Sequence, residues 1–589
     1  MLTVLRRIRP FLAPYRARML VALAAMLGVD AIAYGVPLAI GYVTDRVYPR
    51  LGSSPEAMRE LWVAGALLFA GAVLRGGLAH VMIRAFWSVA ESSVRDIRNS
   101  LYHKLQHLDM DYYDRSRTGD LMSRATYDVQ IIRNFLAFGI EHRARITLIM
   151  GTVFVLMLWQ SPRTALLVYA ALPLFIAAIL FYSGRMRTAV VRQQRQMGRL
   201  NSRLQEHVTG IRTIKAFAVE REEAERFGAE NQAMLERDLE ASLPQAYLNP
   251  ILLITEGVGA LVLLAVSGQR VIAGELPLGV VVAFVSYLGI MGFPLRILAF
   301  NTSLVNLALG ASGRLDEILR RDDQLQQSSG THRAPVSGAV SFESVAFRYP
   351  ESHCVLENVS FQVEPGAHVG LFGLTGSGKS SLISLIPRFY PPTEGRILID
   401  GVPVEEWDLL KLRSQIGTVL QETFLFSASI RENIAFGRPS ASADEIEAAT
   451  RAARIHDFVE SLPEGYDTIV GEHGVGLSGG QKQRLAIART IVQDPRILIL
   501  DDCTSSLDAV TEREIQAQLR ELMRDRTTII VAQRISTLEL ADRIIVLNEG
   551  GVEDIETHDV LVSRNATYRR TYLQQRAGAA VTSGEEPWR

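Results

Sequence analysis

Long apolar segments fill the first half of this chain and then stop. Two of them, 164–184 and 276–295, carry no charge and approach the roughly 20 residues needed to cross a hydrocarbon core. Four more have similar length and at most one Asp, Glu, Lys or Arg: 19–44, 61–83, 146–162 and 247–269. The pattern predicts six membrane-spanning helices.

Two polar connections, 85–145 and 185–245, interrupt the apolar pattern after the second and fourth spans, and both are rich in Arg. The positive-inside rule places both connections and both termini in the cytoplasm. Each connection is patterned as two helices of about 25–30 residues, reaching on the order of 40 Å beyond the membrane. A short break lies near the middle of each, at 114–124 and 207–219. These breaks are either plain surface turns or docking points for a cytoplasmic partner, and their matched placement favours docking.

Four charged residues fall in or beside the apolar segments: Asp30, Arg75, Glu256 and Arg296. A charge in lipid is costly, so these side chains face a water-filled cavity, pair with one another, or lie near an interface and snorkel. The pattern does not choose between these readings.

A polar stretch containing Gly, Ser and Pro begins near residue 314 and predicts a linker over 314–336, after a transmembrane domain over 1–313. A second domain is expected over 337–572, followed by a disordered tail over 573–589. Within that domain, 373–380 reads GLTGSGKS, a full match to the phosphate-binding loop GxxxxGK[ST]. Strand-like HVGLF precedes it and helix-like SLISLI follows, which is the context that such a loop requires.

The stretch 497–502 reads ILILDD, an apolar run that ends in two carboxylates, and 477–484 reads LSGGQKQR. A phosphate loop, LSGGQ and a second acidic strand in this order resemble ABC transporters, specifically exporter half-transporters with six spans fused to one nucleotide-binding domain. The resemblance covers nearly the whole chain. It implies an all-α six-helix membrane domain with long cytoplasmic helical extensions, followed by an α/β P-loop ATPase with a RecA-like core and a helical subdomain. It makes the two breaks coupling helices.

The resemblance also implies an ATP and Mg²⁺ site. The contacts to ATP would come from Gly373, Thr375, Gly376, Ser377, Gly378, Lys379, Ser380, Ser381 and Gln421, with Tyr349 stacked on adenine. Mg²⁺ would be held by Ser380, Gln421 and Asp501. ATP sites of this family form between two domains facing head to tail, so a partner's ATP would be contacted by Ser478, Gly479, Gly480 and Gln481. A dimer is therefore a chemical requirement.

Two positions depart from the family pattern. The general-base glutamate is replaced by Asp502, and the histidine of the later switch strand is replaced by Gln533. Asp is one methylene shorter than Glu, and Gln can hydrogen-bond but cannot carry a proton. We expect ATP binding without efficient hydrolysis, and hence a heterodimer with a non-identical half-transporter that has Glu and His at these positions. The alternative is a slow homodimeric exporter.

The segment 468–474, TIVGEHG, matches the stretch that touches the coupling helices, although Ile469 and His473 stand where exporters commonly have an acidic residue and Arg. The segment 505–508, SSLD, matches the loop that crosses to the partner domain.

Charge and composition limit the classes of molecule that this chain is expected to bind. Lys plus Arg (62) nearly equals Asp plus Glu (63), which gives no support to a nucleic-acid binder. A hydrophobic fraction of 48% fits a chain with a membrane half, in contact with lipid. Arg greatly outnumbers Lys, which is typical of proteins from GC-rich bacterial genomes. We therefore expect the chain to lie in a bacterial inner membrane. Export of a drug, lipid or peptide is the family-level expectation. An ATP-gated channel or regulator is the alternative from another class.

Overall fold

The computed structural model describes residues 1–170, 172–321, 330–349, 353–421, 423–471, 474, 476–502 and 509–583. Contacts within the chain divide it into two units. One, here the membrane unit, comprises Met1–Gln106 and Thr118–Arg321, and the other, here the nucleotide unit, comprises His107–Arg117 and Asp322–Arg589. The side chain of Arg296, the segments 472–473 and 505–508, and residues 584–589 lie outside the description.

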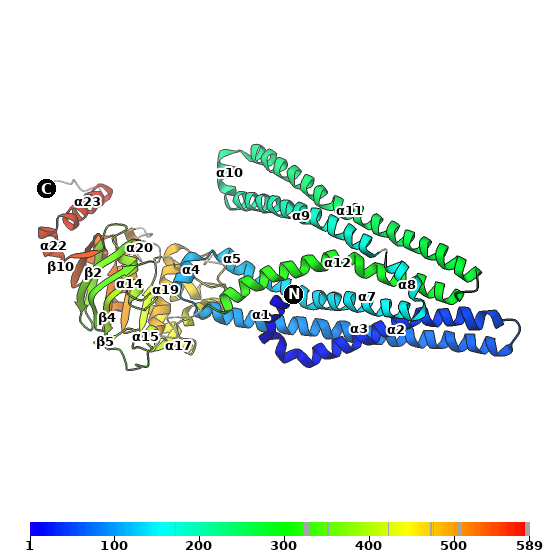
Figure 1. The fold of residues 1–589 in the computed structure, drawn as a ribbon. Coiled ribbons are helices and arrows are strands. Elements are labelled where there is room, and N and C mark those ends of the chain that lie inside the picture. The colour runs from blue at the N-terminus through cyan, green and yellow to red at the C-terminus, as the bar shows by residue number, and fades with distance from the viewer. Residues whose placement is uncertain are drawn as a thin grey trace. The chain divides into compact units, whose positions relative to one another are not determined.

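The described part of the membrane unit is built from helices (Figure 1). Its longest helices are α2 (Arg16–Tyr42), α3 (Pro55–His107), α7 (Ile140–Gln160), α9 (Leu172–Thr209), α11 (Glu220–Ile272) and α12 (Leu278–Leu319). Shorter helices are α1 (Leu2–Leu12), α5 (Thr118–Ser123), α6 (Val129–Asn134), α8 (Pro162–Tyr169) and α10 (Ile211–Phe217). Most described residues of the six predicted spans are helical, although Ser161, Ala170 and residues 276–277 lie outside the helices. The predicted all-α fold class of this half is confirmed.

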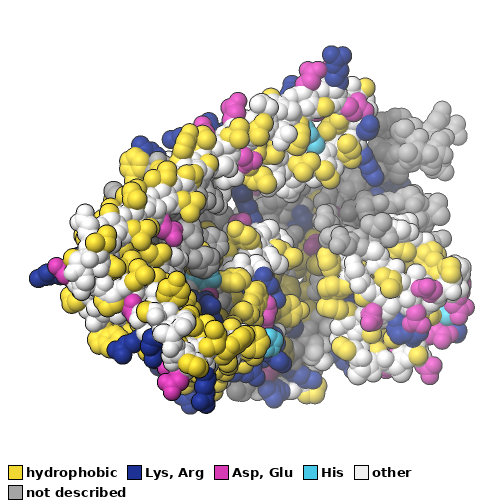
Figure 2. All heavy atoms as spheres, turned by 90° about the vertical axis from the view of Figure 1, so that its right-hand side faces the viewer, with side chains coloured by type: hydrophobic (Ala, Val, Ile, Leu, Met, Phe, Trp, Pro, Cys, Tyr) yellow, Lys and Arg dark blue, Asp and Glu magenta, His cyan; other side chains and the backbone are white. Residues whose placement is uncertain are grey.

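Among the described residues, three continuous helical stretches are long and apolar enough to cross a membrane: Leu2–Arg50, Pro55–His107 and Thr118–Gln160. A shorter apolar stretch lies at Leu278–Gly292. Figure 2 shows hydrophobic side chains over broad parts of the visible face, with charged side chains interspersed among them. Exposed apolar side chains on such helices, for example Leu67 and Phe69 of α3, are those that lipid would solvate.

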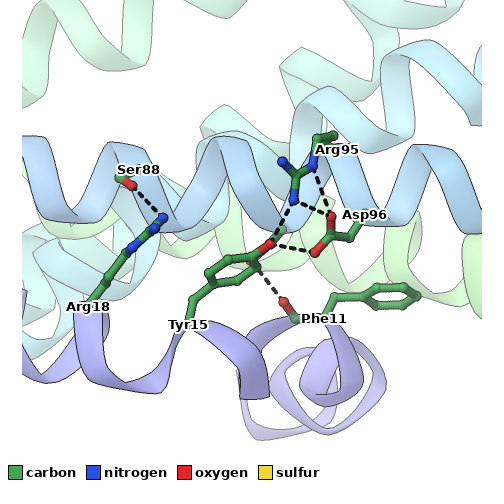
Figure 3. A network of polar contacts seen from close by, with 7 residues as sticks. Phe11, Tyr15, Arg18, Ser88, Arg95 and Asp96 are labelled. Atoms are coloured by element: carbon green, nitrogen blue, oxygen red, sulfur yellow. Dashed lines mark hydrogen bonds and ion pairs between the residues drawn. The ribbon is translucent and has the colours of Figure 1, made fainter.

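The elbow that leads into the first span is held to α3 by a polar network (Figure 3). The hydroxyl of Tyr15 donates to Asp96 Oδ2 at 2.6 Å, and Arg95 donates both to Tyr15 and to Asp96. Arg18 donates to the Ser88 hydroxyl at 3.1 Å. The hydrogen bond from Tyr15, followed by that from Arg95, holds the pKa of Asp96 below its usual range. The network fixes where the chain enters the first long helix.

The two breaks in the polar connections are short helices. In the second connection, α9 and α11 run side by side and are joined by α10, which lies within the predicted 207–219 (Figure 1). Ala218 ends α10 with a left-handed backbone at φ +51°. In the first connection, α4 (Met110–Arg115) begins earlier than the predicted 114–124 and belongs to the nucleotide unit.

The nucleotide unit contains two sheets. A six-stranded sheet has the order β10-β9-β3-β8-β7-β6, with β10 antiparallel to β9 and the other pairs parallel. Its strands are β3 (His368–Gly373), β6 (Ile416–Val419), β7 (Ile497–Asp501), β8 (Thr527–Val531), β9 (Arg543–Asn548) and β10 (Gly551–Glu556). A four-stranded antiparallel sheet has the order β2-β1-β4-β5, with strands β1 (Val340–Arg348), β2 (Cys354–Val363), β4 (Glu394–Ile399) and β5 (Val402–Pro403).

Helices pack around these sheets and complete the predicted α/β domain. They are α14 (Lys379–Leu385), α15 (Leu409–Ser414), α16 (Ile430–Ala435), α17 (Ala443–Ala452), α18 (His456–Glu460), α19 (Gly479–Gln493), α20 (Ala509–Met523), α21 (Ile535–Leu538), α22 (His558–Arg564) and α23 (Ala566–Ser583). Strand β7 is the predicted buried run, since its four aliphatic side chains are buried and only Asp501 is partly exposed. A parallel strand that is covered on both faces of its sheet buries every side chain, and its sequence is therefore a continuous apolar run.

The C-terminal segment differs from the expectation. The sequence predicted a disordered tail from residue 573, whereas α23 continues to Ser583. The segment is rich in Ala, Gln and Arg, which have high helix propensity, and its N-terminal part is anchored by the buried Tyr568. A small and polar composition was therefore an insufficient sign of disorder.

Candidate functional site

The phosphate loop joins β3 to α14, at the carboxyl end of a central strand of the six-stranded sheet. Two of its glycines have left-handed backbones, Gly376 at φ +87° and Gly378 at φ +96°. A Cβ on Gly373 would lie 2.4 Å from Ser377 Oγ and 2.6 Å from the carbonyl oxygen of Leu547. The loop thus closes tightly on itself, and this leaves its backbone facing a cavity.

The cavity has a volume of about 300 Å³. It is lined by Val355, Thr375, Gly376, Gly378, Lys379, Ser380, Ser381, Gln421, Asp501, Asp502, Val531 and Gln533. These residues come from the phosphate loop, α14, the start of β2, the ends of β7 and β8 with the residues that follow them, and the loop after β6. Nearly all the residues predicted for one nucleotide site therefore meet in one place.

The charged side chain deepest in the loop is Lys379. Its Nζ donates to the carbonyl oxygens of Gly373 at 2.7 Å and Leu374 at 3.0 Å. Burial lowers the pKa of Lys379, and the carboxylates of Asp502 and Asp501 oppose that shift. The ammonium group is thus held over the loop by neutral acceptors, which a phosphate group would outcompete.

The two aspartates after β7 have different surroundings. Asp501 is the last residue of the strand, and burial together with the neighbouring Asp502 charge raises its pKa. Asp502 leaves the strand with a left-handed backbone at φ +43° and is 6% exposed. Its N–H donates to the Val531 carbonyl at 2.8 Å, and its Oδ1 lies 3.4 Å from the N–H nitrogen of Gln533. These hydrogen bonds link the ends of β7 and β8, and they hold Asp502 and Gln533, the two residues that depart from the family pattern, close together.

Tyr349 lies beside the cavity and does not line it. Its hydroxyl is 3.1 Å from Ser381 Oγ, and its ring packs edge-on against Phe347 and Tyr390. The hydroxyl of Tyr390 in turn donates to Asp114 Oδ2 of α4 at 2.6 Å. The residue expected to stack on adenine is thus linked, through its ring contact with Tyr390, to the first of the two predicted breaks.

The donor set around the cavity fits a magnesium nucleotide. Ser380, Gln421 and Asp501 offer a hydroxyl, an amide and a carboxylate oxygen, the hard donors that Mg²⁺ takes together with water and phosphate oxygens. The described residues hold no cluster of three His, Cys, Asp or Glu, so an all-protein metal cage is not found among them. The buried Ser377 Oγ has no hydrogen-bond partner within the described residues, as expected of a loop that awaits a ligand.

Comparison with known proteins agrees with this site. The family model for the ABC transporter transmembrane region matches residues 19–295, and the model for the ABC transporter matches residues 356–505. An uncharacterized ABC transporter ATP-binding protein, YknU of Bacillus subtilis (strain 168), is 37% identical over 97% of this chain and 97% of its own length. This chain belongs to the ABC transporter family.

Two further relatives indicate which branch of the family it resembles. The ATP-dependent lipid A-core flippase of Syntrophus aciditrophicus (strain SB) is 31% identical, over 97% of this chain and 94% of its own length. The solved structure of a bacterial Atm1-family ABC exporter with ATP bound is 28% identical and has a TM-score of 0.79, covering 96% of this chain and 99% of that one. The exporter half-transporter fold predicted from the motifs is thereby confirmed.

The signature segment of this ABC exporter lies apart from the cavity of the same chain. Ser478 is the N-cap of α19, and its side chain and that of Gln481 form a reciprocal capping box. Neither of these residues, nor Gly479 or Gly480, lines the cavity, and Ser478 and Gly479 are exposed. The N-terminus of α19 is therefore accessible at the surface of this chain.

Sequence reasoning missed two contributors to the cavity, Val355 and Val531. Both belong to strands that carry no sequence motif at these positions, and only sheet pairing brings the end of β8 beside β7.

In the segment 468–474, Ile469 is 72% exposed and pairs through its backbone with Ser429, while His473 lies outside the described residues.

Proposed function

We infer that this chain is one subunit of a heterodimeric ATP-driven exporter, and that its own ATP site binds nucleotide but hydrolyses it poorly. The observation that carries the proposal is that Asp502 and Gln533 line the same cavity, with 3.4 Å between Asp502 Oδ1 and the backbone nitrogen of Gln533. Both departures from the family pattern therefore act on one reaction centre.

Nucleotide binding is supported by the rest of the cavity. Lys379 and the phosphate-loop amides would hold the phosphate groups, and Ser380, Gln421 and Asp501 would hold Mg²⁺. When bound, Mg²⁺ neutralises charge that develops on the phosphate oxygens. None of these residues departs from the pattern, so affinity for ATP is expected to be ordinary.

Both positions that the resemblance assigns to hydrolysis are altered. The Asp502 carboxylate is shorter than that of Glu by one methylene, about 1 to 1.5 Å, a displacement that can cost about a hundredfold in rate. The short side chain also directs one oxygen toward the Gln533 backbone. Gln533 offers an amide that can orient a water molecule but cannot accept or deliver a proton.

The intact signature supports a role in a partner's site. Ser478, Gly479 and Gly480 keep the family pattern and are available at the N-terminus of α19. A partner half-transporter with Glu and His at the two departing positions would complete one competent site with this signature. Relatives named as putative multidrug exporters and as a lipid flippase support a drug or lipid as substrate, moved across a bacterial inner membrane.

The test is to measure ATPase activity of this chain alone, of this chain with its partner, and of restored variants. The chain alone should bind ATP with little turnover, and adding the partner should restore it. Asp502→Glu combined with Gln533→His should raise turnover of the lone chain by about a hundredfold. The same double variant carrying Lys379→Ala is the matched control, since it restores the base but removes phosphate binding.

Turnover by the unmodified chain alone that matches the turnover of the assembled pair would overturn the heterodimer and support a homodimeric exporter. Substrate flux into inverted vesicles distinguishes export from an ATP-gated channel. Export requires hydrolysis at the competent site, whereas a channel would conduct with a nonhydrolysable nucleotide.

A further inference from the structure

A second cavity, of about 510 Å³, lies inside the membrane unit between α2, α3, α7 and α12. Its wall is mostly apolar, but six polar residues line it: Asp30, Tyr34, Arg75, His142, Arg145 and Ser286, whose hydroxyl donates to the Val282 carbonyl of its own helix; we call the first five the belt residues. We call it the polar-belt cavity. The nucleotide site uses none of these residues.

Asp30 and Arg145 form the centre of the belt. Asp30 is 2% exposed, and its Oδ1 accepts a hydrogen bond from Arg145 Nε at 3.0 Å. Arg145 also donates to Glu141 Oε1 at 3.2 Å, so two carboxylates share one guanidinium, and Arg75 is the other guanidinium that lines the cavity. His142 lies against the other oxygen of Glu141, so a proton on His142 would compensate Glu141 rather than Asp30.

His142 Nδ1 makes no hydrogen bond but pairs with Glu141, and two further buried polar atoms of the belt have no hydrogen-bond partner within the described residues: Asp30 Oδ2 and the Tyr34 hydroxyl. They lie one helical turn apart on α2, both residues line the cavity, and Tyr34 is 4% exposed. A buried carboxylate oxygen without a donor is costly, so a ligand that donates there is favoured. An ammonium group can donate to both oxygens at once.

A second, mostly apolar cavity adjoins the polar-belt cavity. A neighbouring cavity of about 260 Å³ shares His142, Arg145 and Ile297 with the polar-belt cavity. Its other lining residues include Phe86, Trp87 and Phe138. The Trp87 and Phe138 rings pack edge to face at 5.3 Å. A molecule with one charged end and an aromatic or aliphatic body matches this layout, because its body would lie beside these rings.

We propose that the polar-belt cavity binds an amphipathic substrate through an ammonium group, held by Asp30 Oδ2 and the Tyr34 hydroxyl. Arg75, which forms no ion pair within the part of the chain that the structure describes, would take an anionic group when the ligand is zwitterionic. The inference rests on the proposed export function and is independent of the heterodimer. The same ammonium chemistry is offered by a cationic drug and by an aminophospholipid headgroup.

The test measures binding to the full chain in nanodiscs without nucleotide. The probe is monodansylcadaverine, which joins a primary ammonium to an aromatic body, and its N-acetyl derivative lacks the charge. Energy transfer from Trp87 to the dansyl group should saturate, and the amine should bind about tenfold more tightly than the acetylated probe. Equal binding of the two probes, or none, would mean that water satisfies these atoms and would overturn the proposal.

Variants separate recognition from folding. Asp30→Asn should remove the preference for the amine, and Tyr34→Phe should weaken it without disturbing Arg145. Glu141→Gln is the matched control, because it removes the other partner of Arg145 and leaves Asp30 Oδ2 in place. If Glu141→Gln abolishes the preference as fully as Asp30→Asn does, the effect belongs to a loosened Arg145 and the proposal is wrong.

Competition between the probe and a lipid distinguishes the two sources of the ammonium group. In nanodiscs that contain phosphatidylethanolamine in place of phosphatidylcholine, displacement of the probe identifies the lipid headgroup as ligand, and Arg75→Gln should reverse that displacement. Retained probe binding identifies a free amine. Because no step needs ATP, ATPase results that contradict the heterodimer leave this test intact.

Discussion

The phosphate loop offers a matched pair of substitutions, Gly378→Ala and Gly376→Ala. Both glycines have left-handed backbones, at φ +96° and φ +87°. They differ in the space beside them. A Cβ on Gly378 would lie 2.7 Å from Leu356 Cδ2 and 2.9 Å from the Val355 carbonyl oxygen, whereas a Cβ on Gly376 meets nothing within 4 Å.

The magnitudes follow from these two facts. A left-handed backbone costs a non-glycine residue about 1–2 kcal/mol, and both variants incur this cost. Gly378→Ala adds overpacking of about 1–3 kcal/mol, because the Val355 carbonyl belongs to the backbone of β2 and cannot rotate away as a flexible side chain could. Gly378→Ala should therefore lose about 2–5 kcal/mol of stability and Gly376→Ala about 1–2 kcal/mol.

The assay is thermal unfolding of the nucleotide-free full chain in detergent, with both variants and the unmodified protein heated at one rate. About 1 kcal/mol shifts the melting temperature by about 2–4 °C in a unit of this size, so Gly378→Ala should melt several degrees below Gly376→Ala. Omitting nucleotide keeps phosphate binding out of the comparison. Equal melting temperatures would refute the claim that packing against β2 restricts residue 378.

Three further predictions concern charge and coupling. Asp501→Asn should raise the melting temperature of the nucleotide-free chain at pH 7.5, because burial and the Asp502 charge raise the Asp501 pKa; the gain should vanish toward pH 4, where the native carboxyl is protonated. Tyr390→Phe removes the 2.6 Å hydrogen bond to Asp114 and should speed trypsin cleavage within α4 several-fold. Asp128→Asn should lower stability by about 2–3 kcal/mol, since this buried carboxylate accepts two hydrogen bonds from the half-exposed Arg314.

Each has its own control. For Asp501, the raised pKa means that the folded state of the unmodified chain loses stability as the pH rises above the ordinary carboxyl range. An increase in melting temperature by Asp501→Asn that grows on acidification would contradict this prediction. Unchanged trypsin cleavage in Tyr390→Phe would show that the hydroxyl does not hold α4. Glu317→Gln is the matched control for Asp128→Asn, because Glu317 pairs with Arg124 while 61% exposed, and it should change the melting temperature little.

Local pattern was enough for the elements and for the composition of the nucleotide site. Six apolar segments predicted six helices because a helix is the form in which a single segment satisfies its backbone in lipid. The phosphate loop, Asp501 and Gln533 were found because each is marked by residue types at fixed spacing. The extent of α23 was not found, since helix propensity and anchoring through Tyr568 outweigh a small, polar composition.

Tertiary structure decided which groups meet. Sheet order brings the ends of β7 and β8 together, so that Asp502 lies against Gln533, residues more than thirty positions apart in the chain. The sequence showed four charges near the spans and no reason to prefer one of them. Only packing of α2 against α7 pairs Asp30 with Arg145 and leaves one Asp30 oxygen in a cavity, because burial and partners are properties of neighbours that the chain order does not contain.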